Sequence, residues 1–258
     1  MIALHCRNLI SPYTMHRTFI IAIILILTSL CSRAQLVIIK GSKGFANLRS
    51  KPEKYGHTTD RVAEGSVYMI KEASVPPGHT TGNWNWLTQG YVYPASDTLW
   101  KHQTEPREGY LHASQYKMLD ALPALEPGPV TDSCRSFQSH QLQVVICKQP
   151  FLPAAHRVTR KNQVRSAIDD RHIWGTDGGI PAEEIRCIVI YKNGREWKLP
   201  ASAFRSLYQP DLNRSAVYLG QGNYIYIVMA GGDGSGAYHA LWIWKNNALV
   251  STSVFDLP

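Results

Sequence analysis

Cysteine and histidine are the residue types in this 258-residue chain that could carry nucleophilic chemistry. Cys134 is the candidate nucleophile, in the polar stretch Asp132-Ser133-Cys134-Arg135. A reactive thiol needs a lowered pKa, which a helix N-terminus commonly supplies, and a nearby base. No helical apolar period follows Cys134. The candidate bases are scattered along the chain: His140, His156, His172 and His239. We therefore predict no catalytic residue and interpret Cys134 as a structural or free thiol.

A glycine-rich run, Gly231-Gly232-Asp233-Gly234-Ser235-Gly236, could bind an anion through its backbone amides. A nucleotide-type phosphate loop leads into a helix and ends in Gly-Lys-Ser/Thr, whereas a strand-like segment follows here at 238–244. A calcium loop needs further carboxylates at alternate positions, and Asp233 stands alone. We interpret the run as a hairpin turn whose glycines permit positive φ, with anion binding as the alternative.

The sequence gives no support for a metal site or a cofactor. Its histidines lack paired ligand spacing, and Asp169-Asp170-Arg171-His172 places potential ligands side by side instead of on one face. We predict no metal ligand and no cofactor.

Aromatic residues gather in one part of the chain. The alternation in Asn83-Trp84-Asn85-Trp86-Leu87 predicts a half-buried strand with both indoles on one face. Tyr91, Tyr93 and Trp100 follow closely. Exposed rings of this kind would form a flat stacking surface suited to sugar or peptide.

Several short elements would position these rings. Asn47-Leu48-Arg49-Ser50-Lys51-Pro52 predicts a turn after a short strand, because Pro52 biases Lys51 away from the α region. Glu64-Gly65-Ser66 marks a second turn before a strand at 67–70. Together with the Trp strand and Gly109-Tyr110-Leu111-His112, this ordered series resembles the bacterial SH3-like (SH3b) domain over residues 36–119. The long segment between Trp86 and Gly109 departs from the short loop of that family.

The resemblance implies a small SH3-like barrel that recognises peptidoglycan or short peptides, or that positions a neighbouring domain. The contact residues that it implies are Tyr55, Trp84, Trp86 and Tyr110.

The second half of the chain predicts further β-structure. Residues 120–129 are Pro-rich and are interpreted as a semi-rigid linker, followed by a β-rich domain over residues 130–258. Lys192-Asn193-Gly194-Arg195 is a strong hairpin motif, and strand-like runs recur up to residue 255. We predict an all-β fold, with the barrel followed by a β-sandwich-like or meander domain containing few helical turns. Residues 152–184 are left as a solvated surface loop or, alternatively, a binding loop.

The N-terminal 34 residues are typical of a secretory signal peptide. An apolar run at 19–30 is too short to cross a bilayer as a helix and follows His16 and Arg17. Small residues favour cleavage before Gln35, and Met15 is an alternative start to Met1. A lipid anchor at Cys31 is the alternative, but Leu30 is bulky where such sites carry a small residue. We predict an exported protein, periplasmic or extracellular, with no transmembrane segment in the mature chain.

Charge and cysteine content are consistent with export. The first 34 residues hold three arginines and no acid, so their removal lowers the formal charge from +8 to +5. No nucleic-acid-reading motif accompanies this mild basicity, and we predict no nucleic-acid partner. Of five cysteines, Cys134, Cys147 and Cys187 would remain in an oxidising compartment. Three is odd, so at most one intramolecular bridge forms, and the sequence leaves its pairing open.

These observations favour an exported, non-catalytic envelope protein that binds peptidoglycan, a peptide or an envelope protein. One alternative is a purely structural or inhibitory partner protein. The other is a secreted cell-wall hydrolase of cysteine peptidase or amidase type, with the SH3-like module as its targeting domain. Those peptidases carry an Asp-Cys-Ser-Gly motif opening a helix, and Ser133 between Asp132 and Cys134 breaks that pattern.

Overall fold

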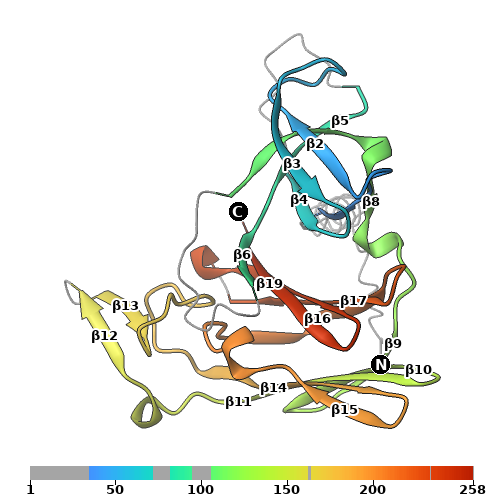
Figure 1. Ribbon diagram of the computed structural model, residues 1–258. Helices are drawn as coiled ribbons and strands as arrows, with labels where there is room; N and C mark the ends of the chain where they lie inside the picture. Colours follow the sequence, from blue (N-terminus) through green and yellow to red (C-terminus); the bar gives the residue numbers. More distant parts are fainter. Residues whose placement is uncertain (1–34, 72–81, 95–105, 162–163, 233, 258) are drawn as a thin grey trace, which may run out of the picture. The chain divides into compact units, whose positions relative to one another are not determined.

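The computed structural model describes residues 35–71, 82–94, 106–161, 164–232 and 234–257 (Figure 1). All of the regular structure in these ranges is β-strand or short 3₁₀-helix. The predicted all-β class with few helical turns is therefore confirmed. Within the same ranges, no helix has the length and apolar character needed to cross a bilayer.

The first sheet has seven strands in the order β3-β2-β7-β5-β4-β1-β8. In that order they are β3 (Thr58–Ala63), β2 (Phe45–Arg49), β7 (Glu108–His112), β5 (Trp84–Thr88), β4 (Val67–Lys71), β1 (Gln35–Ile39) and β8 (Tyr116–Met118).

Six of these strands supply one apolar core, so the sheet curves around it. The buried members of that core are Val37, Ile39, Ala46, Leu48, Val62, Tyr68, Leu87 and Leu111. A single residue pair, Arg49 with Tyr110, joins β2 to β7, and no pairing of described residues joins β3 to β8. The module that we predicted to be a barrel is thus a bent sheet whose hydrogen bonding stays open.

The remaining strands form a sandwich of two five-stranded sheets. One has the order β15-β14-β11-β10-β9, and the other has the order β16-β17-β18-β19-β6. The strands of the first are β15 (Arg195–Lys198), β14 (Glu183–Lys192), β11 (Leu142–Pro150), β10 (Cys134–Ser139) and β9 (Glu126–Val130). Those of the second are β16 (Pro210–Leu219), β17 (Tyr224–Gly231), β18 (Tyr238–Lys245), β19 (Ala248–Asp256) and β6 (Tyr91–Pro94).

The core of the sandwich lies between these two layers (Figure 1). Val144 and Ile188 face it from one sheet, and Val217, Ile227 and Trp242 face it from the other. The predicted sandwich-like meander is confirmed. The predicted Asn193-Gly194 turn also holds: both residues have positive φ, 52° and 74°, as a two-residue hairpin of the primed type requires.

Strand β6 departs from the predicted domain boundaries. Its residues fall inside the 36–119 range, yet it pairs with β19 at the far end of the chain. The side chain of Tyr93 lies in the sandwich core. In addition, the buried Tyr226 hydroxyl donates a 3.2 Å hydrogen bond to the Gly65 carbonyl. Residues Gln35–Pro258 accordingly form one compact unit.

The Pro-rich segment 120–129 is not a free linker. It contains the end of η2 (Leu119–Ala121) and most of β9, which pairs with β10. Leu125 is buried, and its amide donates to the Val217 carbonyl. Strand β9 is the last strand of its sheet, where proline is tolerated because an edge strand leaves amides without ladder partners. Edge position thus explains how a Pro-rich sequence became a strand.

Segment 152–184 also carries more structure than a solvated loop. It contains η3 (Pro153–Ala155) and the separate hairpin of β12 (Val158–Lys161) and β13 (Val164–Ile168). Trp174, further along, is buried, and its amide donates to the Ser206 carbonyl. The charged residues of this segment predicted a solvated loop, but the ring of Trp174 packs into the sandwich core and holds the segment against it.

Candidate functional site

Two aromatic pairs lie next to each other on the outer face of β5 and β7. Trp84 is the cross-strand partner of His112, and their ring centroids are 5.3 Å apart. Trp86 is the partner of Tyr110, with centroids 4.8 Å apart. Both pairs are edge-to-face, the arrangement that the charge distribution of aromatic rings favours. We call these four residues the aromatic strip.

Strand alternation places the strip away from the core. Leu87 and Leu111 point inward and are fully buried, so their neighbours along each strand point outward. All four strip side chains are partly exposed. The inner face of β5 and β7 is therefore buried in the core, and the outer face carries aromatic rings that are only partly covered. The uncovered ring area is available to a ligand.

Two cations flank one row of the strip. The partner of Tyr110 on β2 is Arg49, and the partner of Trp86 on β4 is Lys71. Cross-strand partners share a face of the sheet, so a row of cation, two aromatic rings and cation crosses four strands. Such a row matches a ligand with apolar or CH-rich surface and carboxylate ends.

Arg49 also fixes the loop between β2 and β3. Its Nη1 donates a 2.7 Å hydrogen bond to the carbonyl of Gly56. Tyr55 projects from this loop with 87% of its surface exposed, and Lys54 lies 5.5 Å from the centre of its ring.

The structure therefore brings together three of the four predicted contact residues, Trp84, Trp86 and Tyr110. Tyr55 lies on a separate loop, where its ring contact is with Lys54. Sequence reasoning missed Arg49, Lys71 and His112 as members of the surface. The register of non-adjacent strands brings them together, and no sequence spacing reports that register.

Tyr91 and Tyr93 do not belong to this surface. Tyr93 is buried in the sandwich core, and the ring centroid of Tyr91 lies 5.4 Å from that of Trp174. Both residues belong to β6, which is part of the sandwich. Trp100 lies outside the described residues.

Two glycines of the glycine-rich run, Gly232 and Gly236, pack closely against backbone. A Cβ on Gly232 would approach Gly175 and the Gly236 carbonyl, and one on Gly236 would crowd the Thr176 backbone. The Gly175 amide donates to the Gly236 carbonyl at 3.0 Å. Close approach of two chain segments therefore explains these glycines, alongside the positive φ of Gly232 and Gly234. Asp233 lies outside the described residues.

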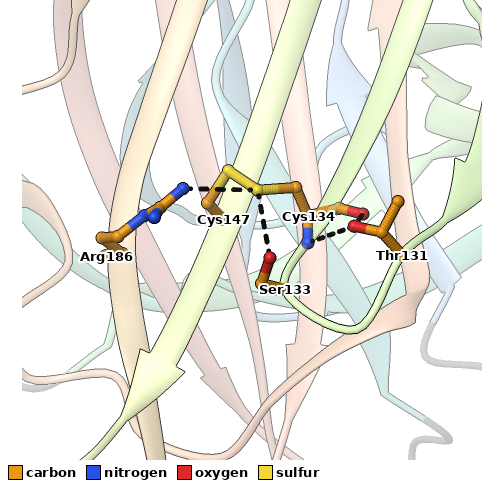
Figure 2. The surroundings of a disulfide bond; sticks show 5 residues. All are labelled: Thr131, Ser133, Cys134, Cys147 and Arg186. Carbon is orange, nitrogen blue, oxygen red and sulfur yellow. Dashed lines mark hydrogen bonds between the residues drawn. A yellow bond between two sulfur atoms is a disulfide. The ribbon is translucent and has the colours of Figure 1, made fainter.

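Cys134 is bonded to Cys147 in a disulfide that links β10 to β11 (Figure 2). Around it, the Arg186 Nη2 atom donates to the Cys134 Sγ atom at 3.5 Å, and the Ser133 hydroxyl lies 3.8 Å from the same sulfur. Among the described residues, the hydrogen-bond contacts of Cys134 include no histidine. In this bonded state Cys134 is neither a free thiol nor a nucleophile, and the disulfide supplies the pairing that the sequence left open.

The His156 ring lies between two carboxylates. Its Nδ1 lies 2.8 Å from the Asp169 carboxylate and its Nε2 lies 3.3 Å from that of Glu184. Its ring stacks on Phe151 at a centroid distance of 4.5 Å. Partial burial acts to raise the pKa of Asp169, but hydrogen bonds from the His156 ring and the Arg157 amide outweigh it and lower that pKa.

This cluster holds the start of segment 152–184 against the sandwich. Asp169 has a positive φ of 53° and accepts from both His156 and the Arg157 amide, so it closes the loop around the hairpin. Among the described residues, no group of three or more histidine, cysteine or acidic side chains is arranged to hold a metal ion.

His239 lies on β18, and its Nδ1 atom is buried without a hydrogen-bond partner in the described structure. Burial, assisted by the positive charge of Arg214, lowers the pKa of His239 to about 4. An unfolded histidine takes up its proton near pH 6.5. Between these two values the unfolded chain binds more protons than the folded one, so stability falls as pH falls through this window.

We expect the wild-type protein to lose up to about 3 kcal/mol of unfolding free energy between pH 7 and pH 4 through this group. His239→Gln should remove that component, while the exposed His140→Gln should retain it. Urea unfolding of the three proteins at both pH values measures the difference. Equal pH dependence in all three would contradict the assignment.

Comparison with known proteins adds no relative: no protein-family model, curated protein or solved structure matches this chain.

Proposed function

We propose that this chain is an exported, non-catalytic envelope protein, periplasmic or extracellular, whose SH3-like module at residues 36–119 binds peptidoglycan through its peptide. The observation that carries the proposal is the aromatic strip of Trp84, Trp86, Tyr110 and His112 with Arg49 and Lys71 beside it. A peptide segment of an envelope protein would offer similar chemistry and is the second partner.

The chemistry of the strip suits this ligand class. Aromatic faces bind the CH-bearing faces of sugars and the side chains of peptides. Arginine and lysine pair with carboxylates, which the peptides of the cell wall carry at several positions. Tyr55 extends from the loop that Arg49 fixes and would contact the same ligand only if that ligand reached beyond the strip.

We expect Trp86→Ala to reduce retention on purified peptidoglycan by about tenfold, and Trp84→Ala together with Trp86→Ala to abolish it. Truncating an interface residue that matters for binding costs more than about 1 kcal/mol, and about 1.4 kcal/mol corresponds to tenfold. Tyr191→Ala is the matched control. Tyr191 is also an exposed aromatic residue on a strand, but its strand, β14, belongs to the sandwich and not to the aromatic strip.

The measurement is co-sedimentation of the full chain from residue 35 with insoluble peptidoglycan. The full chain is needed because β6 belongs to the sandwich, so residues 36–119 are not a separate folding unit. Wild-type protein that stays in the supernatant would remove peptidoglycan as the ligand. Retention that survives loss of both tryptophans would remove the strip as the site.

A further inference from the structure

The three cysteines of the described chain form one row across three neighbouring strands. Cys134 on β10 is the cross-strand partner of Cys147 on β11, and Cys147 is also the partner of Cys187 on β14. Directly opposed residues of antiparallel strands point to the same face of the sheet. Cys147 therefore has a cysteine on each side, and only one of them can bond to it at a time.

The observed bond joins Cys134 to Cys147, and Cys187 is free and half-buried. Opposed residues in an antiparallel ladder lie about 4.5–5.5 Å apart at Cα. That separation falls in the range of about 4.4–6.8 Å over which disulfides form. The register thus places the Cys187 thiol within reach of the existing bridge, on the side opposite Cys134.

The surroundings of the row are asymmetric. Arg186 directs Nη2 toward the Cys134 sulfur at 3.5 Å, reaching across β11 (Figure 2). It can do so because β14 carries a bulge here: Cys187 opposes Cys147 and Ile185 opposes Lys148, which leaves Arg186 as the extra residue. A nearby guanidinium stabilises a thiolate. The Cys134 sulfur is therefore the one whose thiolate is stabilised as the leaving group when the disulfide is broken.

We propose that this row is a thiol–disulfide exchange site in which the bond moves between Cys134–Cys147 and Cys147–Cys187. The Cys187 thiolate attacks Cys147 Sγ, a new S–S bond forms between them, and the Cys134–Cys147 bond breaks. Cys134 leaves as a thiolate beside Arg186 and takes up the proton that Cys187 gave to water. The exchange is an isomerisation, so it consumes no oxidant or reductant.

The exchange changes which strands are covalently joined. In the observed state the bond ties β10 to β11, and in the other state it ties β11 to β14 and frees the start of β10. The thiol set free is that of Cys134, which is more exposed than Cys147. In this second state Cys134 is available to a thiol or disulfide partner.

The first test isolates the alternative bond. In Cys134→Ser, kept in an oxidising glutathione buffer, we expect a Cys147–Cys187 disulfide in nearly all molecules by peptide mapping without reduction. In Cys147→Ser, the matched control, we expect no bond between Cys134 and Cys187, because β11 separates their strands by about 10 Å. Cys134→Ser protein that is folded by circular dichroism yet keeps both thiols free would overturn the proposal.

The second test follows exchange in the unaltered sequence. Wild-type protein incubated at mildly alkaline pH, acid-quenched and alkylated should yield a measurable Cys147–Cys187 fraction, which Cys187→Ser cannot form. Arg186→Ala should slow its appearance about tenfold, the effect of losing one charged hydrogen bond. Arg195→Ala, an exposed arginine on the neighbouring strand, should leave the rate unchanged. Wild-type protein that shows only the Cys134–Cys147 bond at all times contradicts the exchange.

Discussion

Replacing Trp242 by alanine is expected to lower the free energy of unfolding by about 3–5 kcal/mol. Trp242 lies on β18 at the centre of the sandwich core, with none of its surface exposed. Its Nε1 atom donates a 2.9 Å hydrogen bond to the Ala203 carbonyl. Alanine would leave both a large cavity and a carbonyl that has lost its best donor, and these effects act together.

Trp242→Phe separates the two contributions. It keeps most of the ring volume and removes the hydrogen bond, so we expect a loss of about 1–2 kcal/mol. The Thr252 hydroxyl, 3.5 Å from the same carbonyl, remains as a weaker donor and limits that loss. Urea denaturation followed by far-ultraviolet circular dichroism measures both variants. A change below about 1 kcal/mol for the alanine variant would contradict the packing described here.

The second large effect is expected from Gly175→Ala. Gly175 has a φ of 99°, a conformation that side-chain-bearing residues rarely adopt. A Cβ at this position would overlap the Tyr208 carbonyl oxygen and touch the Tyr238 ring. Because the obstacle is backbone, the chain must shift, and we expect a loss of about 2–5 kcal/mol.

Gly179→Ala provides the matched control for this substitution. Gly179 lies four residues further along the same segment, and a Cβ there would meet nothing within 4 Å. We expect its unfolding free energy to stay within about 0.5 kcal/mol of wild type. If both alanine variants unfold at the same urea concentration as wild type, the close approach at Gly175 is not a feature of the protein in solution.

Local patterns predicted much of the β-structure. Alternation and β-branched runs indicated the strands of the sandwich, and Asn193-Gly194 indicated the turn between β14 and β15, because each of these features acts within a few residues. The outward position of Trp84 and Trp86 followed from the same two-residue period. Burial of Leu87, the residue after Trp86, agrees with that alternation.

Features that depend on distant partners were missed. Nothing near Tyr91 indicates that β6 pairs with the last strand of the chain, and nothing in Pro127 or Pro129 indicates an edge strand. The segment around Tyr93 falls within the range predicted for the first module for the same reason. Where the chain crosses from one sheet to another, neighbours in the sequence do not predict which sheet a strand joins.

The sequence contains one indication of the disulfide. Cys134 and Cys147 lie at equal distances from the His140-Gln141 turn, so a two-residue hairpin places them opposite each other. His140-Gln141 lacks the Asn-Gly type of turn sequence, which hid the hairpin. The pairing of Cys147 with Cys187 had no such indication, because the whole 152–184 segment intervenes.

The most direct test of the proposed binding role is the response of indole N–H resonances to a soluble peptidoglycan fragment. The protein from residue 35 is labelled with ¹⁵N-tryptophan, and Trp84→Phe and Trp86→Phe assign the two resonances of the strip. We expect the indole resonances of Trp84 and Trp86 to shift with fragment concentration, and those of the buried Trp174 and Trp242 to stay in place. Saturating fragment that leaves the Trp84 and Trp86 resonances in place would contradict the proposal that this surface binds the cell wall.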